Sequence, residues 1–252
     1  MDFRNKKSWR ALLLVSCLGA AQVSASCIDA AIEKAYLQEN VAALDAQIAS
    51  LAAKTNRSRA EILLYGLAAY RAADLKLLKG DKEGASAALS AAASVLESRL
   101  EKGRDAELGA LLGMIYGMQI RISPFRGIWL GSSADKVLED AMAAEPNNPR
   151  PHLAAGVNLL YKPGTFGGGP EKALAQLQRA IDLYSRTAAT TAADGACWGS
   201  DDAVLAMARA KVKLGERVAA IALVETVLAR SPGNRPAQRL MNGIRGGPKK
   251  GR

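Results

Sequence analysis

Residues 201–234 read DDAVLAMARAKVKLGERVAAIALVETVLARSPGN. Two stretches of strong helix formers, Asp201–Leu214 and Glu216–Ala229, are separated by Gly215, and the Ser-Pro-Gly-Asn run at 231–234 ends the second. Small or apolar residues recur at the spacing of a 34-residue helical repeat, where they let two antiparallel helices approach closely. These residues are Ala208, Gly215, Ala220, Val224, Val227 and Pro232. The stretch therefore predicts a tightly packed helical hairpin.

Three looser copies of this pattern precede it. In the first copy the leading helix is about two turns longer, and in the second and third the loop between the helices is longer by about nine and about five residues. The matching positions are Gly66, Gly80, Ala85, Leu89 and Ala92 in the first copy, Gly113, Tyr116, Ala134, Leu138, Ala141 and Pro146 in the second, and Gly156, Ala173, Leu177 and Ala180 in the third. Most of residues 60–235 thus resembles the tetratricopeptide repeat (TPR) family, and the match is most specific at 201–234.

The resemblance implies a right-handed stack of helical hairpins with a concave groove, which the longer loops of this chain would reshape. TPR proteins bind peptides, helices or partner proteins and rarely catalyse a reaction. Leu112–Tyr184 is also similar to a group of small exported bacterial repeat proteins to which no reaction is assigned. That likeness lies in the Ser-Pro-Phe loop at 123–125, the Pro-Asn-Asn-Pro break at 146–149 and the FGGGPEKA run at 166–173.

The rest of the chain also favours helices, because Ala, Leu, Glu, Lys, Gln and Arg dominate it and no stretch alternates as a strand does. Helices are expected at 28–54, 61–79, 84–100, 106–122, 133–145, 152–161, 170–184, 201–214, 216–229 and 236–244, with loops at 121–131 and 162–169 and a polar connection at 187–199. We therefore predict an all-α, TPR-like solenoid of about four hairpins plus an N-terminal helix, within one domain at 26–244.

Residues 1–25 have the pattern of an export signal. Four basic residues precede the apolar run Ala11–Ala21, and Val23-Ser24-Ala25 supplies the small residues of a cleavage site. The run is too short to span a bilayer, which takes about 20 apolar residues. We expect a bacterial periplasmic protein without a transmembrane segment once the signal is removed. Two alternatives are a buried or amphipathic first helix and a lipid anchor at Cys17, at the end of the Leu-Val-Ser-Cys sequence.

The net charge of +10 is concentrated at the two ends of the chain. Four basic residues fall in the predicted signal and four in the tail at 245–252, which we expect to be flexible. A nucleic-acid-binding protein would instead concentrate Lys and Arg on one folded element. We therefore expect no nucleic-acid partner.

Few residues could carry catalysis or bind a metal. His152 is the one histidine, which argues against a His-rich metal site and against a nucleophile–base pair, so we expect neither enzyme activity nor a cofactor. The glycine-rich run at 164–169 lacks the Lys-Ser/Thr that a phosphate-binding loop requires. Ser200-Asp201-Asp202 is interpreted as a helix cap followed by acids in the first turn. Cys27 and Cys197 could form one disulfide in an oxidising compartment, or remain two free thiols.

The aromatic residues of the loops are the candidate binding residues. Phe125, Trp129, Tyr161, Phe166 and Trp198 lie in or beside the segments that join helices, and the cationic Arg121, Arg126 and Lys162 flank them. Such loops could fold over the groove and offer aromatic anchors to a partner. Alternatively, these side chains fill gaps that Ala-rich helices leave open.

The favoured function is that of a non-catalytic scaffold or adaptor that binds another protein. The alternative is a small-ligand-binding accessory component of a periplasmic uptake system. An adaptor should present an open groove, whereas a ligand carrier should present a closed pocket lined by Phe125, Trp129 and Phe166.

Overall fold

The computed structural model describes residues 27–187 and 196–246. These ranges contain helices and no strand. The α-helices are α1 (Ala30–Leu37), α2 (Val41–Ala52), α3 (Arg59–Leu78), α4 (Lys82–Leu100), α5 (Ala106–Ile122), α6 (Gly127–Ala144), α7 (Pro149–Tyr161), α8 (Pro170–Thr187), α9 (Ser200–Lys213), α10 (Arg217–Arg230) and α11 (Arg235–Arg245). Two short 3₁₀ helices, η1 (Pro124–Arg126) and η2 (Gly164–Phe166), lie in the connections. The predicted signal at 1–25, with Cys17, lies outside the described residues.

The helices pair as antiparallel hairpins, α3 with α4, α5 with α6, α7 with α8 and α9 with α10. Successive leading helices α3, α5, α7 and α9 also contact one another, whereas α4, α6, α8 and α10 lie on the outside of the stack. Helices α1 and α2 precede the first hairpin, and α11 packs on α9 and α10 after the last. The structure is therefore the all-α helical-hairpin solenoid that the repeat pattern predicts.

Glycines of the leading helices permit the close approach within two hairpins. A β-carbon built on Gly113 would lie 2.5 Å from Leu138, and one on Gly156 would lie 2.6 Å from Leu177. Both leucines are buried on the second helix of their hairpin. The close approach of paired helices at small residues, which the repeat spacing predicts, is thus confirmed at Gly113 and Gly156.

The N-terminal segment differs from the single helix expected over 28–54. It forms two short helices, because Glu39 has a left-handed backbone (φ 55°) and Asn40 begins α2 by accepting a hydrogen bond from the amide of Ala43. The apolar stripe crosses the break, so periodicity alone did not reveal it. The polar Gln-Glu-Asn trio at 38–40 is the local signal that was available.

The segment 121–131 is also more helical than expected. Only Ser123–Arg126 connects α5 to α6, and Pro124 begins the short η1 helix with a backbone angle suited to a helical turn. Helix α6 then begins at Gly127, so that Ile128 and Trp129 lie in its first turn rather than in a loop.

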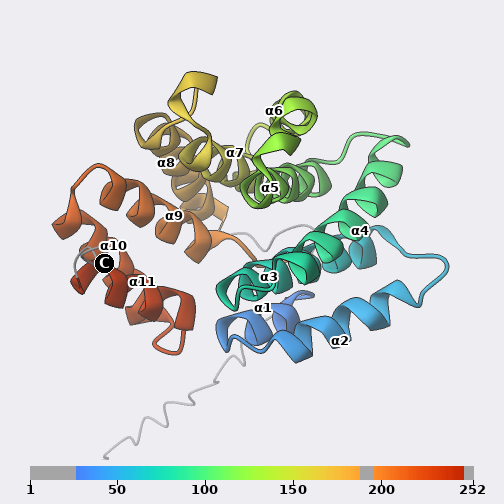
Figure 1. Cartoon of the computed structure of the whole chain (residues 1–252), viewed down its shortest axis with the longest axis horizontal. Helices are drawn as coiled ribbons and strands as arrows, with labels where there is room; N and C mark the ends of the chain where they lie inside the picture. Colours follow the sequence, from blue (N-terminus) through green and yellow to red (C-terminus); the bar gives the residue numbers. More distant parts are fainter. Residues whose placement is uncertain (1–26, 188–195, 247–252) are drawn as a thin grey trace, which may run out of the picture.

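The two ends of the solenoid meet (Figure 1). A disulfide joins Cys27, just before α1, to Cys197, just before α9. Glu39, which follows α1, forms an ion pair with Arg239 of α11. Helix α11 ends at Arg245, which is also the first residue of the predicted tail. The Arg245 side chain donates a hydrogen bond to Glu225, and residues 247–252 lie outside the described ranges.

Within the described ranges, no helix combines the length and apolar character needed to cross a membrane.

Candidate binding surface

A group of large apolar side chains is exposed where α5 turns into α6. Phe125 is 78% exposed, Ile128 76% and Trp129 58%, and all three lie within five consecutive residues. Phe166, in η2, is 72% exposed. We call Phe125, Ile128, Trp129 and Phe166 the aromatic surface. Their exposure decides against the gap-filling interpretation for the three aromatic members, and it shows that they do not line a closed pocket.

The loop that carries Phe166 has a defined conformation. Gly167 and Gly169 both have positive φ angles, and the Gly169 amide donates to the Leu159 carbonyl at 2.9 Å. A β-carbon on Gly168 would lie 2.0 Å from the carbonyl oxygen of Lys162. The glycines that resemble a phosphate loop therefore fold the backbone tightly between α7 and α8.

A salt bridge ties this loop to α6. Lys162 Nζ lies 2.6 Å from a carboxylate oxygen of Asp135. Asp135 is on the helix that begins with Ile128 and Trp129. The connection links the segment bearing Phe166 to the helix bearing Trp129, although the two aromatic residues come from different hairpins.

Cationic side chains meet an aromatic ring at the ends of three successive leading helices. The guanidinium of Arg121 lies 4.5 Å from the ring centroid of Tyr161, and Lys213 Nζ lies 5.0 Å from the same centroid. Lys213 also donates to the Leu160 carbonyl at 3.0 Å. The remaining predicted cation, Arg126, lies 3.5 Å from the Ser90 hydroxyl. Lys213 was missed in the sequence because it belongs to a hairpin distant from the loops.

Trp198 belongs to a different part of the molecule from the other seven predicted residues. Its side chain is buried, with the Arg150 guanidinium 5.2 Å from the ring. Its carbonyl accepts hydrogen bonds from Arg150 Nε and the Tyr184 hydroxyl, both at 3.2 Å. Arg150 is in the first turn of α7, whereas Tyr161 ends that helix. Trp198 therefore has the packing role that the alternative interpretation assigned to all five aromatics.

A buried arginine at the centre of α3 was not singled out in the sequence. Arg71 donates to both carboxylate oxygens of Glu33 at 2.9 Å and to those of Asp202 at 2.8 and 2.6 Å. Its guanidinium also lies 4.1 Å from the ring centroid of Tyr36. Asp202 was interpreted only as a first-turn acid of α9. Its position there is correct, but the cap residue is Gly199 rather than Ser200.

Burial raises the pKa values of Glu33 and Asp202, whereas the Arg71 guanidinium that they share lowers them. Burial raises the pKa of Glu33 more than Arg71 lowers it. At Asp202 burial also acts upward, but Arg71 outweighs it and holds the pKa below its usual value. Glu33 is therefore the first of the two to take up a proton as the pH falls.

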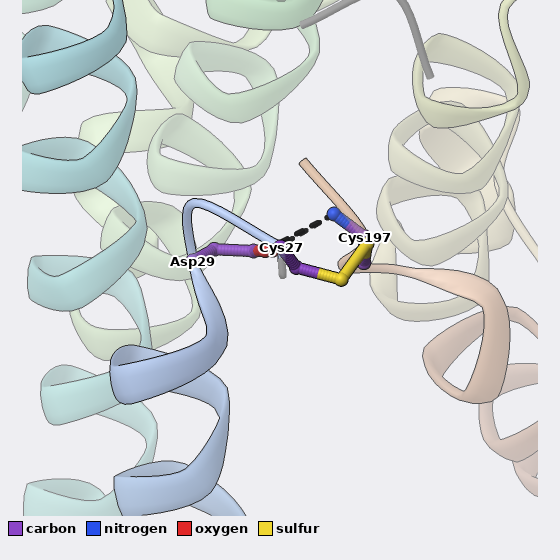
Figure 2. A group of neighbouring side chains, drawn as sticks. All are labelled: Cys27, Asp29 and Cys197. Carbon is purple, nitrogen blue, oxygen red and sulfur yellow. Dashed lines mark hydrogen bonds between the residues drawn. A yellow bond between two sulfur atoms is a disulfide. The ribbon is translucent and has the colours of Figure 1, made fainter. Parts of the chain in front are cut away.

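The disulfide region contains the one metal-like grouping found among the described residues. The sulfur atoms of Cys27 and Cys197 and a carboxylate oxygen of Asp29 lie within 4.8 Å of one another (Figure 2). Because the sulfurs are bonded to each other, they offer no thiolate to a metal. The Asp29 carboxylate instead accepts from the Cys197 amide at 3.1 and 3.2 Å. His152 lies elsewhere, with Nδ1 2.8 Å from Gln176.

Comparison with known proteins finds likeness in structure. No family model matches the chain, and no curated protein matches it in sequence. The HusA haemophore from Porphyromonas gingivalis has a similar structure, with 25% identity and a TM-score of 0.53, over 73% of this chain and 91% of that one. A thermophilic TPR protein of Thermus thermophilus gives 20% identity and a TM-score of 0.49, over 82% and 98% of the two chains. The chain is therefore similar to a haemophore in its helical-hairpin fold.

Proposed function

We propose that this protein is a non-catalytic binding protein of the bacterial periplasm and that its aromatic surface docks another protein. The observation that carries the proposal is the exposure of Phe125, Ile128 and Trp129 beside one another. Monomeric proteins rarely expose contiguous apolar area of this kind unless it is functional. The periplasmic location rests on the signal-like pattern of residues 1–25.

The chemistry of the surface describes the partner. Aromatic and arginine side chains are enriched at protein interfaces and supply most of the binding energy there. Arg121 lies in the last turn of α5, and Arg126 directly follows Phe125 in η1. The partner surface should therefore have an apolar centre that receives Trp129 and carboxylates that face the two arginines.

Site-specific photo-cross-linking in intact cells tests this proposal. The full chain carries a photo-reactive benzoyl-phenylalanine in place of Ile128, and adducts are identified by mass spectrometry. We expect one partner protein whose yield falls at least about tenfold with Trp129→Ala, since a central interface tryptophan is commonly a hot spot. Val218→Ala is the matched control, because Val218 is 84% exposed on α10 and away from this surface. Equal yields with the two variants, or no adduct, would refute the protein-docking role.

The likeness to a haemophore favours a second candidate function, that of a carrier for a flat, apolar anion such as haem. Phe125, Trp129 and Phe166 could cover a porphyrin face, and Arg121 and Arg126 could pair with its carboxylates. Tyr161, which ends α7 and is not a member of the aromatic surface, is of a residue type that ligates haem iron. Arg121 and Lys213 both face the Tyr161 ring, so the two cations would remain beside the tyrosine if it bound iron.

Haemin titration distinguishes the two candidates. If the chain carries haem, the Soret band should shift and saturate at one equivalent, Trp129→Ala should weaken binding, and Val218→Ala should leave it unchanged. Tyr161→Phe should alter the Soret position if the phenol ligates iron. A titration that matches free haemin throughout would exclude the carrier role and leave protein docking untouched.

A further inference from the structure

Two exposed cations lie at the rim of the solenoid where the leading helices end. Arg121 is in the last turn of α5, and Lys213 ends α9. In the described part of the chain neither forms an ion pair with an acid, whereas Lys211, two residues before Lys213, pairs with Glu216 at 2.7 Å. Both cations face the ring of Tyr161 at the end of α7. We call Arg121, Tyr161 and Lys213 the cationic rim.

The cationic rim concentrates positive charge around one ring. The Arg121 guanidinium carbon and Lys213 Nζ lie 4.5 and 5.0 Å from the ring centroid, so they are at most 9.5 Å apart. The C-terminal ends of the three helices carry roughly half a negative charge each, which offsets the two cations only in part. Like charges this close repel, and an anion between them relieves the cost. Because both side chains are exposed, they can close on an anion from solvent.

The cationic rim also has hydrogen-bond donors without acceptors. Lys213 uses one of its three N–H groups on the Leu160 carbonyl, at 3.0 Å, which leaves two. Among the described residues no acceptor meets the guanidinium of Arg121 or the hydroxyl of Tyr161. The rim therefore suits a ligand that offers several acceptor oxygens.

Tyr70 on α3 adds a buried hydroxyl near this rim. The side chain is 8% exposed, and within residues 27–187 and 196–246 its hydroxyl forms no hydrogen bond. Burial and the carboxylate of Asp74 raise the pKa of Tyr70, whereas the charge of Arg121 lowers it, so the guanidinium lies close enough to act on this hydroxyl. Asp74 itself accepts from the Tyr36 hydroxyl at 3.0 Å. Buried polar atoms nearly always have a partner, so the Tyr70 hydroxyl indicates a missing one.

We infer that the cationic rim binds the dianionic phosphoryl group of a phosphate monoester or of free phosphate. At neutral pH such a group carries about two negative charges and three acceptor oxygens, which matches two cations better than a singly charged carboxylate does. Arginine pairs with phosphate oxygens through its planar fork, and lysine pairs as a point charge. The hydroxyls of Tyr161 and Tyr70 are the further donors. The inference goes beyond protein docking and does not depend on it.

Three phosphates that differ in charge and substituent test this inference. The ¹⁵N-labelled full chain is titrated at constant ionic strength and about pH 7.5, above the second phosphate pKa of about 6. The probes are methyl phosphate, the monoanionic dimethyl phosphate and inorganic phosphate. The backbone amides of Tyr161 and Lys213 are the reporters, and that of Val218 on α10 is an internal control.

We expect saturable shifts of the two reporters with methyl phosphate, and at least about tenfold weaker binding of dimethyl phosphate. The Val218 amide should not shift. Tighter binding of inorganic phosphate than of methyl phosphate would identify the free ion as the ligand, and the reverse order would identify an ester.

Variants then identify the recognising groups. Lys213→Met should weaken methyl phosphate binding about tenfold or more, whereas Lys211→Met, which removes an acid-paired lysine of the same helix, should not. Tyr70→Phe should weaken binding about threefold or more. Equal affinity for the methyl and dimethyl esters, equal effects of the two lysine variants, or the absence of a saturable shift would each overturn the assignment. The two cations would then serve only to offset the helix ends.

Discussion

At Gly156 the approach of α7 to α8 leaves no room for a methyl group. A β-carbon there would lie 2.6 Å from Leu177 Cγ and 3.2 Å from the Leu177 amide nitrogen. Because Leu177 is fully buried, its side chain cannot move aside without repacking the hairpin. We expect Gly156→Ala to lower the free energy of unfolding by about 1–3 kcal/mol, measured by urea denaturation.

The control for this prediction is a helical glycine in open space. Gly243 lies in α11 with no heavy atom within 4 Å of a built β-carbon. Gly243→Ala should raise stability by about 0.5–1 kcal/mol, since alanine is the better helix former. The two substitutions make the same chemical change but should alter the free energy of unfolding in opposite directions. A stabilised Gly156→Ala protein would show that the hairpin is packed more loosely than the structure indicates.

At the scale of the elements, Arg71 holds α1, α3 and α9 together through Glu33 and Asp202. Removing one partner of a buried ion pair leaves uncompensated charge, which commonly costs about 3–5 kcal/mol. We therefore expect Arg71→Met to destabilise the protein by about 3 kcal/mol or more in urea denaturation.

Lys76→Met on the same helix provides the comparison. Lys76 pairs with Asp45 at 2.8 Å, but that carboxylate is 46% exposed and water can replace the lost contact. Such a pair contributes about 1 kcal/mol or less. Equal losses from Arg71→Met and Lys76→Met would mean that the buried cluster does not hold the three helices together.

At the scale of the whole molecule, the disulfide joins residues 170 positions apart and closes the solenoid. Constraining so long a loop in the unfolded chain is worth about 4–5 kcal/mol. Replacing Cys27 and Cys197 together by serine should therefore lower stability by about this amount. Hydrogen exchange should become faster in α1 while α5, which packs between other hairpins, stays protected.

The same double variant separates the disulfide from the other contacts of α1. The Arg71 cluster and the Glu39–Arg239 ion pair remain available when the cysteines are replaced. Unchanged exchange in α1 would show that these polar contacts are sufficient to keep the ends of the solenoid together.

The periodicity of the chain was sufficient to predict the hairpins and much of their packing. Gly113, Gly156, Leu138 and Leu177 could be placed because helical spacing and residue size act locally, within one pair of adjacent helices. The break at 38–40 was missed because the apolar stripe continues across it, and the early start of α6 was missed because its proline- and glycine-containing segment was interpreted as a loop. The pair of cysteines allowed a disulfide but did not require one.

The sequence by itself therefore determined the fold class and the helix pairs, because these depend on neighbours along the chain. The tertiary structure alone decided that Trp198 is buried while Phe125 and Trp129 are exposed, since all three occupy similar inter-helix positions in the sequence. It also decided that Arg71 meets Asp202, 131 residues away. Exposure and ion pairing depend on which distant helices cover a side chain, and only the curvature of the whole stack brings the start of α1 near the start of α9, where the disulfide and Arg71 link them.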